Sequence, residues 1–173
     1  MIISKRASDV TYYFKLVRGD EHNRTVGEIA MALPARISIA TLGVSDLARS
    51  TRFYQALGWK LTADSSALIS FFQTAGGVLA LYPFDDLAGD AALPALRSSG
   101  FGGVTLAINL ERPEDVQPGL DAAEAAGATI LKPATKAEWG GVSGYFADPD
   151  GYPWEVVWAP NSKFKPDGSL DVS

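Results

Sequence analysis

The sequence predicts an α+β fold in which two βαβββ modules pair in one chain, with mixed sheets around a concave cleft. Three observations lead to this fold class. Strand-like and helix-like segments follow one another in the same order twice, Gly and Ser clusters separate them, and each half is too small to bury a sheet alone. A length of 173 residues with 47% hydrophobic residues fits one domain with a real core.

The first module is expected over residues 36–84. Its helix can be capped by Ser45 or Asp46 and should end at Gly58, because apolar residues recur between them at helical spacing. The strands are rich in β-branched and aromatic residues, and turn-forming residues separate them. The expected elements are a strand at 36–44, a helix at 45–58, and strands at 59–64, 67–74 and 77–84.

The second module is expected over residues 101–160, after a polar, Ala-rich linker at 85–100. Pro113 suits the first turn of a helix, Gly127 suits its end, and Pro118 can disturb the opening turns. The expected elements are a strand at 101–110, a helix at 112–127, and strands at 128–133, 141–148 and 152–159.

The two ends of the chain differ from this pattern. Residues 1–30 are polar and lack its periodicity, so they are expected to be a flexible N-terminal extension or translated upstream sequence. The domain proper is expected at 31–160, and the polar tail 161–173 should lie along its surface.

Composition excludes several kinds of site. There is no cysteine, which removes disulfides and thiolate chemistry, and the single histidine, His22, lies in a charged stretch typical of a solvated loop. A net charge of −5 without a basic run argues against nucleic acid or an anionic membrane as partner. Neither a membrane-spanning run nor a signal peptide is evident, so a cytoplasmic location is expected.

Glu155 is the most informative charged residue, because it interrupts an apolar strand. Side chains alternate along a strand, so Trp154, Val156 and Trp158 share one face and Glu155 and Val157 the other. If the tryptophan face packs on a helix, Glu155 faces the cleft. It is then a solvent-facing charge, an acceptor for a ligand, or a metal ligand or general base.

Two phrases point to a family. "VSDLARSTRFYQALGW" and "FADPDGYPWE" together resemble the vicinal oxygen chelate superfamily, over about residues 36–160. That superfamily includes glyoxalase I, extradiol dioxygenases, and fosfomycin- and bleomycin-resistance proteins, and this chain is most similar to a bacterial glyoxalase-like branch. The resemblance implies the glyoxalase/bleomycin resistance/dihydroxybiphenyl dioxygenase fold.

In metal-dependent members, the resemblance implies two inward ligands from each module, one on its first strand and one on its last. Carried onto this chain, these positions fall at Ile39, Ala80, Gly103 and Glu155. Only Glu155 is a ligand type, and a divalent metal needs at least three protein donors. We therefore expect no metal and no cofactor.

Alternation places further residues on the expected cleft face or beside it. Each of them can hydrogen-bond a ligand or simply pack a strand, and the two aromatic ones either wall the cleft or cap the core. These candidate ligand-binding residues are Thr41, Tyr82, Thr105, Asn109, Trp139 and Tyr145, with Glu155.

The resulting hypothesis is a metal-free protein of the glyoxalase/bleomycin-resistance type that holds a small organic molecule in its cleft. One alternative is a divergent lyase, isomerase or dioxygenase-like enzyme that uses Glu155 as base or metal ligand. Another is a protein–protein interaction module whose cleft is filled by its own side chains. A homodimer is expected, because sheets of this kind leave edges that pairing can cover.

Overall fold

The computed structural model describes residues 33–97 and 100–172. The chain divides into two units, Met1–Ala35 and Arg36–Ser173, and the second unit holds both predicted modules. The expected N-terminal extension, residues 1–30, and His22 lie outside the described residues.

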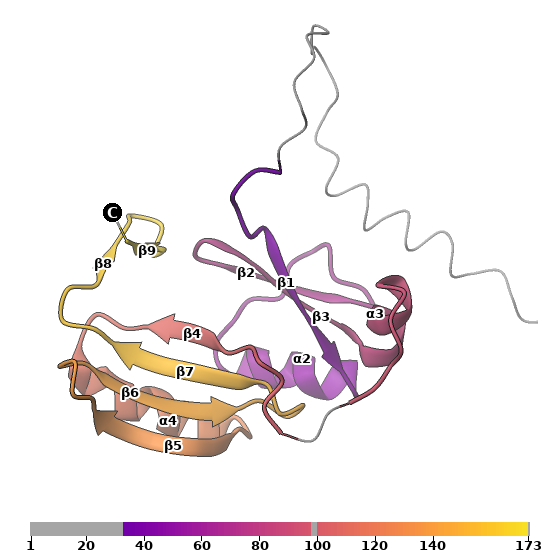
Figure 1. Cartoon of the computed structure of the whole chain (residues 1–173). Helices are drawn as coiled ribbons and strands as arrows, with labels where there is room; N and C mark the ends of the chain where they lie inside the picture. The colour runs from indigo at the N-terminus through magenta and orange to yellow at the C-terminus, as the bar shows by residue number, and fades with distance from the viewer. Residues whose placement is uncertain (1–32, 98–99, 173) are drawn as a thin grey trace, which may run out of the picture. The chain divides into compact units, whose positions relative to one another are not determined.

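The first module forms a three-stranded sheet, here sheet A, with strand order β1-β3-β2 (Figure 1). β1 pairs with β3 in parallel, and β2 pairs with β3 antiparallel. The prediction of a strand at 59–64 is wrong, because this segment makes only one isolated β-bridge, from Leu61 to Phe72. The elements are β1 (Ile39–Val44), α2 (Leu47–Ala56), β2 (Ser70–Thr74) and β3 (Gly77–Pro83).

Helix α2 begins and packs as its sequence predicts. The Asp46 side chain caps it by accepting a hydrogen bond from the Arg49 backbone N–H at 2.9 Å. Its buried residues are Ser50, Phe53 and Tyr54, and the two aromatic rings meet edge to face with centroids 5.0 Å apart. This side of α2 supplies the centre of the hydrophobic core.

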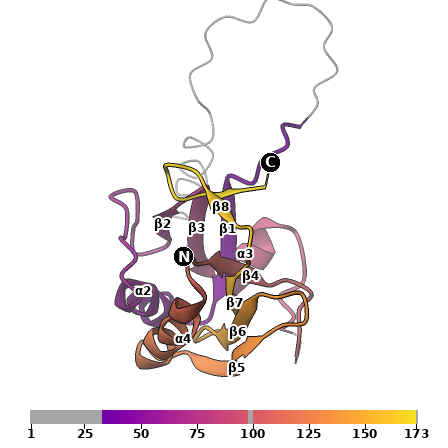
Figure 2. The ribbon, with the colours of Figure 1, turned by 90° about the vertical axis from the view of Figure 1, so that its left-hand side faces the viewer.

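The expected polar linker contains a short helix, α3 (Phe84–Asp90). Asp85 and Asp86 stand in its first turn, where a carboxylate favours the positive end of a helix. Figure 2 shows α2 and α3 on opposite faces of sheet A. Gly43 permits this contact, because a Cβ there would stand 2.9 Å from the Phe84 ring.

The second module forms a four-stranded sheet, here sheet B, with strand order β4-β7-β6-β5. The helix expected at 112–127 is present but opens with a 3-10 turn, and Pro118 lies in the first turn of α4, where proline is tolerated. The elements are β4 (Leu106–Asn109), the 3-10 turn η1 (Pro113–Asp115), α4 (Val116–Ala125), β5 (Thr129–Lys136), β6 (Val142–Ala147) and β7 (Pro153–Trp158).

The tail was expected to be a plain polar segment, and it forms a small hairpin instead. β8 (Lys163–Phe164) pairs antiparallel with β9 (Leu170–Asp171), so that Phe164 and Leu170 lie opposite each other. No helix in the described part of the chain is both long and apolar enough to span a bilayer.

The core joins the two modules. Phe146 and Trp154 stack with an interplanar angle of 5°, and both rings also approach α2: Phe53 lies 6.3 Å from Phe146, and Tyr54 lies 5.9 Å from Trp154. The expectation that the Trp154 face of its strand packs on helices is therefore met. Val156 shares the Trp154 face of β7, and both it and Leu120 of α4 are buried in the same core.

Candidate functional site

A cavity of about 750 Å³ lies between sheet A and β4. Figure 1 shows β2, β4 and the β8–β9 hairpin around this region. Both modules and the tail contribute to its wall, so it exists only once the whole unit has folded. Its lining residues are mainly apolar or small: Ala40, Gly58, Trp59, Ala75, Gly76, Gly77, Val78, Leu79, Leu106, Ala107, Ile108, Trp154, Phe164, Gly168 and Leu170, with Ile37 at the chain's entry to β1.

Two tryptophans form the aromatic part of this wall. Trp59 follows the end of α2 and Trp154 comes from β7, and their rings meet edge to face with centroids 5.5 Å apart. The Trp154 Nε1–H donates to the Tyr54 hydroxyl at 3.1 Å, so its polar atom is engaged on the core side. The cavity therefore meets the apolar surface of the Trp154 ring, and Trp59 adds a second aromatic ring to the same wall.

The "DPDG" turn holds this wall in place. The Tyr54 hydroxyl donates to an Asp148 oxygen at 2.7 Å, and burial together with the nearby Asp148 charge raises the pKa of Tyr54. The other Asp148 oxygen accepts from the backbone N–H groups of Asp150 and Tyr152, each at 2.9 Å. The predicted turn is confirmed, and Gly151 adopts a φ of 88°, which favours glycine.

Asp150 fixes the start of α2 to the same turn. One of its oxygens accepts from the Ser45 backbone N–H at 2.7 Å and the Ser45 hydroxyl at 2.6 Å, and the other accepts from the Ser50 hydroxyl at 2.5 Å. Arg49 adds an ion pair at 3.0 Å. These contacts join segments about 100 residues apart and set the position of α2, and with it Trp59, against sheet B.

Six polar side chains belong to the described lining, and three of them have hydrogen-bond partners. The Gln73 amide donates to the backbone oxygens of Thr74 and Gly77, and the Thr74 hydroxyl also donates to Gly77 O, so both side chains brace the β2–β3 turn. The remaining polar lining residues are Ser38, Lys60, Asn109 and Ser169.

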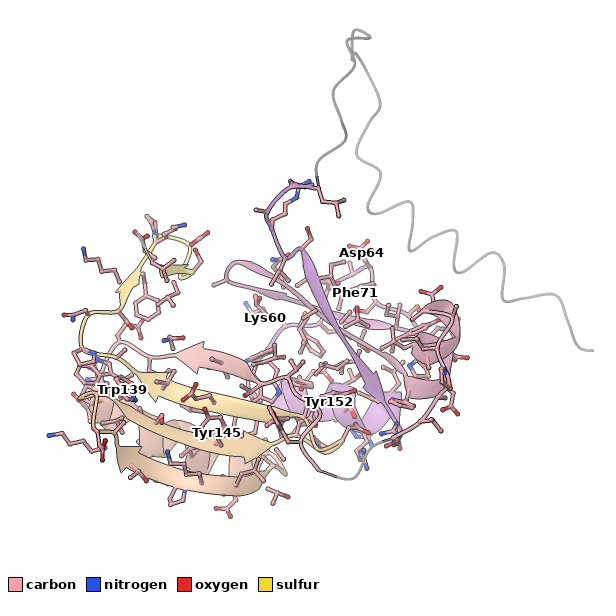
Figure 3. The ribbon with its side chains drawn as sticks, in the orientation of Figure 1. Lys60, Asp64, Phe71, Trp139, Tyr145 and Tyr152 are labelled. Carbon is pink, nitrogen blue, oxygen red and sulfur yellow. The ribbon has the colours of Figure 1, made fainter. Side chains whose placement is uncertain are left out.

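Of the seven candidate ligand-binding residues, Asn109 is the one that lies on the described wall of this cavity. Glu155 lies on the face of sheet B opposite Trp154, in a cross-strand row that runs Ala107, Glu155, Tyr145 and Lys132. Ala107 and Asn109 share this face and still border the cavity, because β4 is an edge strand of sheet B. Burial and a hydrogen bond to Glu155 raise the pKa of Tyr145. The Lys132 ammonium lies 5.9 Å from the Tyr145 ring centre, and Figure 3 shows Tyr145 over this sheet.

The other candidates also lie away from the cavity. Thr41 and Tyr82 alternate with the core residues Leu42 and Leu81, on the face of sheet A opposite α2. Trp139 is 57% exposed, and its ring lies over Gly141, where a Cβ would come within 1.8 Å of it. Trp139 therefore packs on a turn at the end of sheet B (Figure 3).

The strand registers correct one expected metal position. Thr41 pairs with Ala80 and Ile39 with Val78, while Ala107 pairs with Glu155. Ala107 thus corresponds to Thr41, and the counterpart of Ile39 is the residue two positions before Ala107.

That residue is Thr105, whose hydroxyl donates to Pro153 O at 3.1 Å. The expected position Gly103 is two residues early and lies outside β4. The corrected set of Ile39, Ala80, Thr105 and Glu155 offers one carboxylate and one hydroxyl, which does not fit a divalent metal. Within residues 33–97 and 100–172, no three His, Cys, Asp or Glu side chains gather as a metal site.

Most of the cavity wall does not follow from the sequence pattern. That pattern predicts a strand for Trp59 and Lys60, a core position for Trp154 and a surface segment for the tail. A usable signal was present for the tail alone, because Phe164 and Leu170 flank a "PDGS" turn in a hairpin-like spacing.

Comparisons with known proteins agree with this architecture. The family described as Glyoxalase/Bleomycin resistance protein/Dioxygenase superfamily matches residues 36–156. A glyoxalase-related enzyme from Fulvimarina pelagi is 34% identical, with a TM-score of 0.73, over 81% of this chain and 99% of that one.

Two more distant structures show the fold alone. A glyoxalase/bleomycin resistance protein/dioxygenase from Nocardioides is 24% identical over 95% of this chain and 100% of that one, with a TM-score of 0.60. Lactoylglutathione lyase from Agrobacterium tumefaciens is 22% identical over 73% and 95%, with a TM-score of 0.56. No curated protein matches the chain.

Proposed function

Because the chain belongs to the Glyoxalase/Bleomycin resistance protein/Dioxygenase superfamily, we propose that it binds a small organic molecule in the cavity between its two modules. The observation that carries this proposal is the cavity itself, about 750 Å³ and walled mainly by apolar side chains. Sites for small organic ligands commonly have about 300–1,000 Å³ and a predominantly apolar lining with a few polar groups. Binding in this site requires no bond to be broken.

The proposal includes a metal-free site. It is supported by the cavity lining, whose described residues include no His, Cys, Asp or Glu side chain. The four positions equivalent to the family's metal ligands lie on other faces of the sheets, and of these Ile39 and Ala80 have no side-chain donor atom while Thr105 donates its hydroxyl to Pro153 O. An interaction module with a filled cleft is supported less well, because the cavity between the modules is open.

Binding of a neutral apolar dye tests the proposal. N-phenyl-1-naphthylamine should show saturable fluorescence enhancement with the wild-type chain. Ser38→Trp should abolish it, because Ser38 is exposed, lines the cavity and points to the same side of β1 as Ala40. The matched control is Ala125→Trp, on the exposed end of α4 outside the lining, which should bind the dye normally. Absence of saturable binding to the wild type would overturn the proposal.

A second candidate function is catalysis on the opposite face of sheet B. It is favoured by the Tyr145 hydroxyl, which hydrogen-bonds the half-buried Glu155 carboxylate and so pairs an acid with a base. The similarity to a glyoxalase-related enzyme, the protein from Fulvimarina pelagi, adds support.

If Glu155 acts as a base, protein treated with a metal chelator should convert methylglyoxal and glutathione to S-lactoylglutathione. The Glu155→Gln variant should lose this activity. Equal rates in the two proteins, or no turnover, would remove this candidate.

A further inference from the structure

Lys60 is the one charged side chain in the described lining of the cavity. The chain as a whole is acidic, with 20 Asp and Glu residues against 15 Lys and Arg residues, yet no carboxylate belongs to the described lining of this space. A positive charge at the edge of an apolar cavity attracts an anion and disfavours a cation, which would find no counter-charge there.

The position of Lys60 leaves its ammonium group available. It directly follows Trp59, is exposed, and forms no ion pair with any other residue in the described ranges. Figure 3 shows Lys60 in the region between β2 and β4. A ligand anion at this point therefore does not have to displace a protein carboxylate.

The rest of the lining favours an apolar or aromatic body next to that charge. Trp59 and Trp154 present ring surfaces, and Phe164 and Leu170 of the tail hairpin add apolar area from the other side. Aromatic rings are bound well by such walls, through burial and through edge-to-face contacts.

Few other polar groups are free to recognise the ligand. Gln73 and Thr74 brace their turn, and the Ser169 hydroxyl donates to Asp167 at 2.7 Å. Asn109 makes no hydrogen bond within the described structure, but it pairs with Val157 and so its side chain lies on the Glu155 face of sheet B. Lys60 and the exposed Ser38 hydroxyl are therefore the polar groups of the described lining that have no protein partner and can meet a ligand.

We propose that the ligand class of this cavity is a small aromatic or apolar organic anion, whose anionic group pairs with Lys60 and whose body lies between Trp59, Trp154 and the tail hairpin. This proposal rests on the proposed function, since it names the chemistry of the ligand for the same cavity. It departs from the site expected from the sequence, where Glu155 was the recognising charge.

A matched pair of dyes tests it. 8-Anilinonaphthalene-1-sulfonate and N-phenyl-1-naphthylamine share one aromatic scaffold, and only the first carries a sulfonate. The sulfonate dye should bind the wild-type chain about five- to tenfold more tightly than the neutral dye, as a partly exposed ion pair would give. Lys60→Gln should remove this preference without changing the affinity of the neutral dye, and Lys60→Arg should retain most of it.

Lys136→Gln is the control for net charge. Lys136 is exposed on β5, at the edge of sheet B farthest from β4, so its loss should leave the preference intact. Ser38→Trp should block both dyes.

The outcomes separate the two proposals. If the neutral dye binds but Lys60→Gln leaves the preference unchanged, or Lys136→Gln lowers it equally, the ligand class is wrong and the binding function stands. If neither dye binds saturably, the binding function itself is wrong.

Discussion

Asp148 and Asp150 stand two residues apart in one turn, yet their surroundings shift their pKa values in opposite directions. Burial raises the pKa of Asp148, although it accepts hydrogen bonds from Tyr54, Tyr152 and Asp150. Burial also acts on Asp150, but the hydrogen bonds from Ser45, Ser50 and Arg49 outweigh it and lower its pKa. Asp150 is therefore the carboxylate whose charge stabilises the fold.

Replacing Asp150 by Asn should lower the free energy of unfolding at pH 7 by about 2 kcal/mol, because the donors around it lose a charged acceptor. A depressed folded-state pKa contributes stability that is present above the unfolded pKa of about 3.9 and is lost as pH falls through the folded value. The difference in unfolding free energy between the wild type and the Asp150→Asn variant should therefore become smaller below about pH 4. Urea denaturation at pH 7 and pH 3 measures it, and a gap independent of pH would contradict the assignment.

The face of each strand residue could be predicted from alternation, and the pairing of Trp154 with the core followed from it. The role of a residue that lies beside a strand could not be predicted in this way. Lys60 faces the cavity because the segment after α2 stays irregular, and no local pattern carries that information. Glu155 was placed on the correct face of its strand, but alternation cannot say which of two sheet faces borders an open cavity.

At the scale of elements, β6 and α4 approach each other closely at Gly144. A Cβ at this position would stand 2.4 Å from Leu120 Cδ1 and 2.8 Å from the backbone oxygen of Lys132. Gly144→Ala should therefore cost about 1–3 kcal/mol of unfolding free energy through overpacking, measurable by thermal or urea denaturation.

Gly102→Ala is the control for that substitution. A Cβ at Gly102 would meet nothing within 4 Å, and its φ is not in the left-handed region. Its stability should stay within about 0.5 kcal/mol of wild type. If both variants lose the same unfolding free energy, Gly144 is not required for the close packing of β6 on α4.

The long periodic elements could be predicted, while the short ones depended on tertiary contacts. α2, β3, α4, β6 and β7 lie within the expected ranges. Residues 59–64 are bridged only at Leu61 and therefore do not extend as a strand. α3 and the tail hairpin are too short for the periodicity of their residues to distinguish them from loops. Packing against sheet A stabilises α3, and the pairing of Phe164 with Leu170 stabilises the hairpin, because intrinsic propensity alone does not stabilise such short elements.

At the scale of the whole molecule, we predict that the purified protein holds no stoichiometric transition metal. The reason is the single carboxylate at the family's metal positions. Elemental analysis after dialysis should give far less than one Ni, Zn, Fe or Mn per chain, and about one per chain would contradict the prediction.

We also predict that the chain forms a homodimer. β2 and β5 are sheet edges, and the segment that joins the modules exposes Leu93, Leu96, Phe101 and Val104, each by more than 60%. Sedimentation at micromolar concentration should give twice the chain mass of 18.4 kDa. Phe101→Ser together with Leu96→Ser should shift it toward the monomer if this segment is the interface.

The clamp between α2 and the "DPDG" turn has a consequence for synthesis on the ribosome. Ser50 bonds Asp150 and Tyr54 bonds Trp154, each across 100 residues of chain. Because the N-terminal part emerges first, the aromatic side of α2 lacks its partners Phe146 and Trp154 until β6 and β7 of the second module have been made. Contacts of such long range also slow folding. A nascent chain halted before Phe146 should therefore expose Tyr54 and Phe53 and recruit chaperones that recognise aromatic surface.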